Sequence, residues 1–276
     1  MRTLKLTLSY DGTDYVGWQR QANGRSIQQV VEEAFAPLME SGEPPTVVGA
    51  GRTDAGVHAL AQVASATLEI DYDVSAIQRA LNVRLPLDVR VLEVVDAAPG
   101  FHAQFHATGK TYRYRIATTP ILSPFDRRFV WHAPTLGSVE TMRRAAKALV
   151  GRHDFVSFQA GGSMMRDTIR TITRVELRET PGEVHVEVDG EGFLRHMVRV
   201  IVGTLAEIGA GARPVDDLAR VIAARDRRAA GLTAPASGLT LVEVKYGERS
   251  ASSRAGVRPG LRHSGPDPTS SGPSRR

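Results

Sequence analysis

The stretch that most constrains the fold is a short apolar run that breaks into glycines around one carboxylate before apolar residues resume. It reads Val47-Val48-Gly49-Ala50-Gly51-Arg52-Thr53-Asp54-Ala55-Gly56-Val57-His58-Ala59-Leu60-Ala61. Short apolar runs on either side of a glycine-rich break are typical of two strands joined by a loop. We therefore predict a strand, a functional loop and a second strand in this order.

Asp54 is the carboxylate of this loop, two residues after Arg52 and two before Gly56. Glycine lets the backbone approach a ligand closely, and a nearby cation keeps a carboxylate ionised, as a nucleophile requires. The alternative is an Asp-x-Gly turn whose side chain bonds only its own backbone. A dinucleotide-binding loop is excluded because Asp54 occupies the third glycine position of that fingerprint.

The composition is that of a globular protein. Of the 276 residues, 42% are hydrophobic, which is enough for a substantial core. No apolar run approaches the roughly 18 residues of a membrane span, and the chain begins with a strand-like alternation in place of a signal peptide. We therefore expect a cytoplasmic protein with no membrane partner. The absence of cysteine excludes a thiolate nucleophile.

The formal net charge of +5 is concentrated at one end of the chain. Residues 248–276 hold six Arg against Glu248 and Asp267, so the rest is nearly neutral and overall basicity does not argue for RNA binding. The cations are mostly Arg, which binds phosphate bidentately and stacks on bases, although high Arg usage also follows genomic base composition. Because Gly, Pro and Ser dominate the last residues, we predict a disordered tail over 248–276.

Strands and helices alternate along the chain, which indicates an α+β fold. The capping box at Ser26–Gln29 opens a predicted amphipathic helix, and a long apolar segment over 193–208 predicts a buried helix. Two-residue periodicity predicts strands over 4–10, 62–70, 89–95, 110–116, 168–178, 183–189 and 238–246, and helical periodicity predicts further helices over 75–83, 138–150 and 214–228.

Three groups of side chains outside the Asp54 loop are candidates for chemistry. Gln19 and Arg20, next to Trp18, suit base-edge contacts, which makes them candidate substrate-binding residues, although Trp18 also suits a buried anchor. Tyr112 shares one strand face with Tyr114, and that face is either core or a stacking platform.

Arg199 lies within the predicted buried helix, together with Arg195 and His196 near its start. A buried cation needs a carboxylate or a phosphate, so the alternatives are a binding site and a core ion pair. His102 and His106 have the spacing of metal ligands on a helix, but no acidic third ligand is near, and we expect no metal.

Five motifs in this order identify a family. They are Tyr10-Asp11-Gly12-Thr13 with Gly17-Trp18-Gln19, the segment Gly51–His58, Lys110-Thr111-Tyr112-Arg113-Tyr114, Phe193-Leu194-Arg195-His196-Met197-Val198-Arg199, and the closing Gly238-Leu239 strand. The sequence resembles the tRNA pseudouridine synthase A family over residues 1 to about 246. Arg195 departs from the family pattern, in which His is more frequent, and the tail is an addition.

The resemblance implies both a reaction and residue roles. Pseudouridine formation breaks the N1 glycosidic bond, turns the uracil and rejoins it through C5, with no redox change and hence no cofactor. Asp54 matches the nucleophile, and Arg199 matches the cation that pairs with it. Tyr112 matches the ring that stacks on the target uracil. Arg52 matches the residue that fills the space of the flipped base or binds its phosphate.

The resemblance also implies the architecture and the partners. The expected fold is two similar α/β halves with a joined, mostly antiparallel sheet and a central active-site cleft. We place the half with the Asp54 loop at 1–105 and the second half at 106–247. The implied substrate is tRNA at uridines 38, 39 and 40 of the anticodon stem-loop, bound by a homodimer.

Two other functions account for part of these features. A non-catalytic RNA-binding protein explains the aromatic and Arg side chains, but it gives no reason for a glycine-flanked Asp54 paired with Arg199. A glycoside hydrolase also places a carboxylate beside a sugar carbon, but it usually needs a second carboxylate, and no comparable acidic motif is present.

Overall fold

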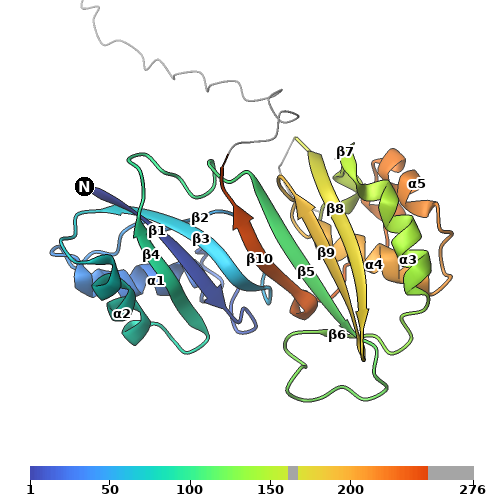
Figure 1. Cartoon of the computed structure of the whole chain (residues 1–276), viewed down its shortest axis with the longest axis horizontal. Coiled ribbons are helices and arrows are strands. Elements are labelled where there is room, and N and C mark those ends of the chain that lie inside the picture. Colours follow the sequence, from blue (N-terminus) through green and yellow to red (C-terminus); the bar gives the residue numbers. More distant parts are fainter. Residues whose placement is uncertain (161–166, 248–276) are drawn as a thin grey trace, which may run out of the picture.

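The computed structural model of the chain describes residues 1–160 and 167–247, so the predicted tail at 248–276 lies outside the described residues. The described chain forms one sheet of ten strands (Figure 1). Eight of them follow the order β4-β1-β3-β10-β5-β9-β8-β7, and the other two are β2, which pairs with β3, and β6, which pairs with β5. Most neighbouring strands are antiparallel. The predicted joined, mostly antiparallel sheet is therefore present.

The strands lie close to where two-residue periodicity places them. The first half holds β1 (Arg2–Tyr10), β2 (Val48–Gly49), β3 (His58–Leu68) and β4 (Val89–Asp96). The second half holds β5 (Gly109–Ala117), β6 (Trp131–His132), β7 (Gly151–Asp154), β8 (Ile169–Thr180), β9 (Glu183–Gly190) and β10 (Leu239–Lys245). The predicted strand–loop–strand around Asp54 is confirmed by β2 and β3.

Strand β10 joins the two halves. It pairs in parallel with β3 through Leu241 opposite Ala59, and antiparallel with β5 through the same Leu241 opposite Tyr112. The last strand of the chain therefore lies between the strand that follows the Asp54 loop and the strand that carries Tyr112 (Figure 1). This topology brings residues from both halves to one place.

The helices are α1 (Ile27–Phe35), α2 (Val74–Arg84), α3 (Val139–Ala146), α4 (Met197–Gly209) and α5 (Asp217–Ala224). Ser26 caps α1 by accepting a hydrogen bond from the Gln29 amide at 3.2 Å, as the capping box predicts. Its apolar stripe, from Ile27 to Phe35, is buried in the core. In the part of the chain that the structure describes, no helix is long and apolar enough to cross a membrane.

Two predicted helices are wrong at their ends. Helix α4 begins at Met197, because His196 has a φ of 61°, in the left-handed region where a right-handed helix cannot continue. The apolar residues just before α4 belong to a loop. Because Leu194 of this loop is buried, the loop is as apolar as a buried helix, and the sequence pattern did not separate the two. Helix α5 ends at Ala224 because Arg225 has a φ of 51°.

The two histidines with metal-ligand spacing do not lie on a helix. The segment between them is a turn, in which His106 Nδ1 accepts a hydrogen bond from the His102 amide at 3.1 Å. Within residues 1–160 and 167–247, no three His, Asp or Glu side chains are grouped so that they could hold a metal ion.

Candidate active site

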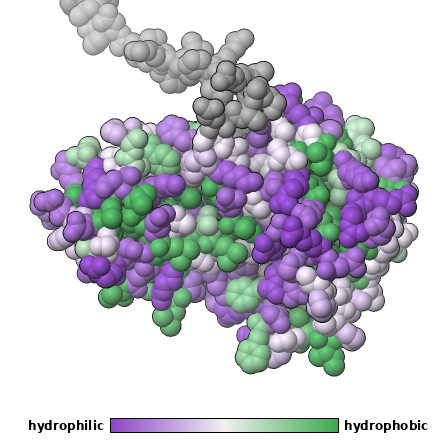
Figure 2. Space-filling view, in the orientation of Figure 1, coloured by the Kyte–Doolittle hydropathy of each residue, from purple (hydrophilic) through white to green (hydrophobic). Residues whose placement is uncertain are grey.

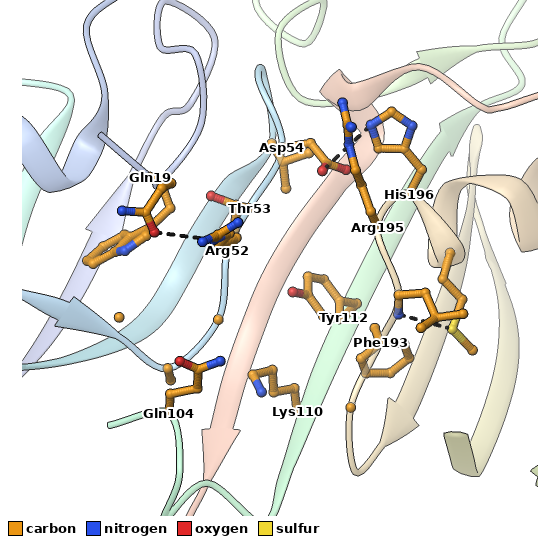
Figure 3. A pocket seen from close by; sticks show the side chains of 18 of the residues that line it. Gln19, Arg52, Thr53, Asp54, Gln104, Lys110, Tyr112, Phe193, Arg195 and His196 are labelled. Atoms are coloured by element: carbon orange, nitrogen blue, oxygen red, sulfur yellow. Dashed lines mark hydrogen bonds and ion pairs between the residues drawn. The ribbon is translucent and has the colours of Figure 1, made fainter. Parts of the chain in front are cut away.

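A cleft of about 1570 Å³ lies where the Asp54 loop, β5 and the loop before α4 meet (Figure 3). Its lining includes Gln19, Arg52, Asp54, Tyr112 and Arg199 among the residues selected from the sequence. Arg20 does not line the cleft. Its Nη1 pairs instead with Glu32 Oε2 at 3.0 Å.

Backbone contacts from the N-terminal segment hold the Asp54 loop in place. The Trp18 amide donates to the Thr53 carbonyl at 3.1 Å, and the Tyr10 hydroxyl lies 2.9 Å from Thr53 Oγ1. Gly17 has a φ of 104°, and a Cβ there would lie 2.4 Å from the Thr53 carbonyl oxygen. Only glycine fits this approach. Trp18 is 2% exposed, so it is the buried anchor of this loop.

Asp54 faces two basic groups that come from the other half of the chain. Arg199 Nη1 lies 3.7 Å from Asp54 Oδ2. His196 Nε2 lies 3.6 Å from Asp54 Oδ1 (Figure 3). The Asp54 side chain is 22% exposed, so one side of the carboxylate is open to the cleft.

The Arg199 side chain is held by a second contact. Its Nε donates to the Ala234 carbonyl at 2.8 Å, while its own carbonyl accepts from the Ala234 amide at 3.1 Å. One turn further along α4, a Cβ at Gly203 would lie 2.0 Å from the Leu232 carbonyl oxygen, so the helix must be bare there for this segment to pack. This close packing keeps the segment that contains Ala234 against α4, where the Ala234 carbonyl holds the Arg199 side chain beside Asp54.

His196 is a site residue to which the sequence did not assign a role. Burial lowers the pKa of its imidazole, and this effect exceeds the opposing influence of the Asp54 carboxylate. The ring is therefore neutral at neutral pH and approaches Asp54 as a polar group without full charge. The signal in the sequence was its place three residues before Arg199, but its left-handed backbone and its approach to Asp54 were visible only in the structure.

Tyr112 and Tyr114 share a strand face but have different surroundings. Tyr112 lines the cleft, is 7% exposed, and packs edge-on against Phe193 with ring centroids 5.1 Å apart. Burial raises the pKa of the Tyr112 hydroxyl well above its usual range, so it stays protonated. Tyr114 is fully buried, and its hydroxyl donates to the Pro235 carbonyl at 2.7 Å. The face is thus core at one tyrosine and cleft at the other.

Arg52 is not the cation beside Asp54, although it is close in sequence. Its side chain is exposed, and its Nε donates to Gln19 Oε1 at 3.2 Å. Gln19 is oriented in turn by donating from Nε2 to Gln28 Oε1 at 2.6 Å. Arg52 and Gln19 therefore form one hydrogen-bonded group on the side of the cleft that faces α1 (Figure 3).

A carboxylate that faces basic groups beside a protonated tyrosine, in a cleft built from both halves, is an arrangement that suits an enzyme acting through a carboxylate nucleophile. The chain belongs to the tRNA pseudouridine synthase family, whose sequence model matches residues 7–106 and 145–247. Pseudouridine synthases are isomerases, so the predicted fold class and enzyme class are confirmed.

Named relatives support the same assignment. Over 246 residues the chain is 46% identical to a tRNA pseudouridine synthase A of Syntrophotalea carbinolica, covering 89% of this chain and 97% of that one. Over 249 residues it is 46% identical to a tRNA pseudouridine synthase A of Limosilactobacillus fermentum, covering 89% of this chain and 96% of that one. A solved structure of a Cbf5-Nop10-Gar1 complex matches 86% of this chain and 48% of that one with a TM-score of 0.38 and 12% identity, too distant to inform the site.

Proposed function

We propose that this protein converts uridines 38, 39 and 40 of the anticodon stem-loop of tRNA to pseudouridine, with Asp54 as the nucleophile. The observation that supports the nucleophile most directly is the position of its carboxylate, 3.7 Å from Arg199 and 3.6 Å from His196 and open to the cleft. The positions in tRNA rest on the family resemblance.

The attack on the uridine and the turning of the base each have groups in the cleft that suit them. Asp54 attacks the target uridine and forms a covalent bond to it, and the N1 glycosidic bond breaks. When the uracil rejoins the sugar through C5, Asp54 leaves as a carboxylate and the C5 proton is lost to solvent. Arg199 balances the charge of the free carboxylate before the attack and after its release. The Tyr112 ring stacks on the uracil and holds it while the base turns, and its hydroxyl is protonated and so can donate a hydrogen bond. The reaction consumes no oxidant or reductant, and we propose that it needs no cofactor.

The target base must leave the helical stack before it can reach Asp54. Arg52 is exposed at the rim of the cleft, and Gln19 orients it by a hydrogen bond at 3.2 Å. We assign Arg52 to the space that the flipped base leaves or to its phosphate, and Gln19 to the same contact. Arg20 remains a predicted substrate contact, outside the cleft and beside Glu32.

Release of tritium from C5-labelled uridine in tRNA tests the reaction. We expect release by the wild-type protein and none by Asp54→Asn. Transcripts in which uridines 38, 39 and 40 are replaced one at a time by cytidine test the positions, since each replacement removes the release due to that uridine. Tight tRNA binding without release would indicate a non-catalytic RNA-binding protein, and free uracil would indicate a hydrolase.

We also propose, from the resemblance alone, that the protein acts in the cytoplasm as a homodimer. Sedimentation equilibrium of the full chain should give twice the chain mass of 29.9 kDa. A mass equal to one chain at micromolar concentration would contradict the dimer.

A further inference from the structure

Lys110 is a cation in the cleft that has no hydrogen-bond or ion-pair partner among the described residues. It lies two residues before Tyr112 on β5 and therefore on the same face of the sheet. Figure 3 shows Tyr112 between Asp54 and Lys110 in the cleft. Within the described part of the chain, its ammonium group makes no hydrogen bond and no ion pair, although the side chain is half-buried. By contrast, Lys245 pairs with Asp189 at 3.5 Å.

The backbone around Lys110 leaves room for this side chain. A Cβ at Gly51 would lie 2.9 Å from Lys110 Cε, so the lysine stem packs against the loop that carries Asp54. Gly190 of β9 lies opposite Lys110 on one side and opposite Ile172 of β8 on the other. Arg170, two residues before Ile172, lines the same cleft.

Lys110 and Arg170 act on each other electrostatically. Burial lowers the pKa of the Lys110 ammonium, and the Arg170 charge lowers it further. Burial also lowers the pKa of Arg170. Among the described residues, the carboxylate that pairs with Arg170 is Asp167, 3.9 Å away and 80% exposed. Two half-buried cations with so little compensation destabilise the free protein, and an anion between them would reverse this.

We propose that Lys110 and Arg170 form a phosphate subsite that binds a backbone phosphodiester of the RNA while the neighbouring uracil stacks on Tyr112. This rests on the proposed function for the identity of the RNA. A full negative charge is the match for two cations, whereas a neutral uracil carbonyl would leave most of their charge uncompensated. Lysine supplies a point charge and arginine a planar fork, both of which bind phosphate.

The test pairs protein variants with single neutral linkages in the RNA. Anticodon stem-loops carry one methylphosphonate at a time, at each linkage around the target uridine, and their dissociation constants are measured for the wild type and Lys110→Met. For the wild type, we expect one linkage to weaken binding about tenfold, as loss of a charge-assisted hydrogen bond does. For Lys110→Met, that linkage should have no further effect, while every other linkage should behave as in the wild type.

Two further variants make the outcome decisive. Lys147→Met removes the same charge from an exposed lysine at the end of α3, outside the cleft, and should keep the wild-type linkage profile. Lys110→Arg keeps the charge and should keep the sensitive linkage. An unchanged profile in Lys110→Met, or loss of the sensitive linkage in Lys147→Met, overturns the subsite. Because this test reads dissociation constants and not tritium release, failure of tritium release would contradict the proposed function and would not by itself decide the phosphate subsite.

Discussion

Strand β5 carries cations on both of its faces, and the two faces pair them differently. On the face away from the cleft, Arg113 Nη2 lies 2.7 Å from Glu187 Oε1, and Arg115 Nη2 lies 2.6 Å from Glu183 Oε1. On the cleft face, Lys110 has no partner among the described residues and Tyr112 borders open space. The cross-strand register places Arg113 directly opposite Glu187, so its partner is supplied by the neighbouring strand.

Neighbouring strands extend the paired face. Arg174 of β8 lies 2.7 Å from Asp189 and 3.1 Å from Glu187, both on β9. Figure 2 shows hydrophilic residues gathered over this part of the sheet. Charges that are already paired stabilise the sheet and bind a further ligand weakly. In the cleft, cations outnumber carboxylates: its lining includes Arg52, Lys110, Arg170, Arg195 and Arg199 but, among the described residues, only the carboxylates Asp54 and Glu191. The nearly neutral body of the chain is therefore basic where the substrate is proposed to bind.

The largest expected effect comes from Asp54→Asn, which keeps the shape of the side chain and removes its charge. Turnover should fall on the order of 10⁴-fold or more, as loss of a nucleophile does. The dissociation constant for tRNA should change little, since phosphate contacts supply most of the affinity. Single-turnover assays with excess enzyme measure the isomerisation rate, and an equilibrium binding titration measures the dissociation constant. Isomerisation at more than a tenth of the wild-type rate would remove Asp54 from the role of nucleophile.

Arg199→Ala should abolish measurable turnover and lower stability. It removes the cation 3.7 Å from Asp54 and the hydrogen bond to the Ala234 carbonyl. Because Asp54 is partly exposed, we expect a decrease in the free energy of unfolding of about 1 to 3 kcal/mol, less than for a fully buried pair. Urea denaturation measures this value. Arg199→Lys keeps the charge but not the fork, and full activity in either variant would show that the pair is structural.

Tyr112→Ala should raise the activation free energy by about 1 to 3 kcal/mol, because the stacking on the uracil is lost. Any loss of proton transfer adds to this value. Tyr112→Phe keeps the ring and its contact with Phe193, so it should lose only what the hydroxyl contributes. The ratio of turnover to KM for the two variants separates these effects. Wild-type behaviour of Tyr112→Ala would place the tyrosine outside the site.

The smallest effect on activity is expected on the paired face, from Asp189→Asn. Burial alone would raise the pKa of Asp189, but hydrogen bonds from Thr111 and Arg174 outweigh it and hold the pKa below its ordinary value. Such a carboxylate adds stability above its unfolded pKa of about 3.9, and this stability is lost as pH falls through the lower, folded value. We therefore expect a shallower acid loss of stability in the variant and unchanged turnover at pH 7.

Thermal unfolding between pH 2 and pH 7 measures the acid dependence of Asp189→Asn. The exposed Glu40→Gln serves as the matched control, since it removes one carboxylate charge without a described partner. If Asp189→Asn and the wild type lost stability equally as the pH fell, the lowered pKa of Asp189 would not contribute to the stability of the protein. A large loss of turnover would mean that the two faces of β5 are not independent.

Local periodicity was sufficient to predict the strands and helices that have one buried face and one polar face. Strand β5 alternates between buried tyrosines and paired arginines, so its bounds and faces were predicted from Lys110 to Ile116. Helix α4 was predicted too long, because Phe193 and Leu194 of the preceding loop are as apolar as the buried helix that follows. Where both sides of a segment are buried, the pattern no longer distinguishes loop from helix.

By itself, the sequence determined the family, the mixed α+β fold and the choice of Asp54 as the candidate nucleophile, because these follow from short motifs and from two local periodicities. The family resemblance also implied that Arg199 pairs with Asp54, but only the tertiary structure decided that His196 faces the same carboxylate and that Arg52 does not. Arg52 is two residues away yet turns to Gln19, whereas Arg199 and His196 come from the second half of the chain, at the start of α4. Side-chain partners depend on strand order and on single backbone angles, such as the φ of His196, and neither leaves a periodic trace in the chain.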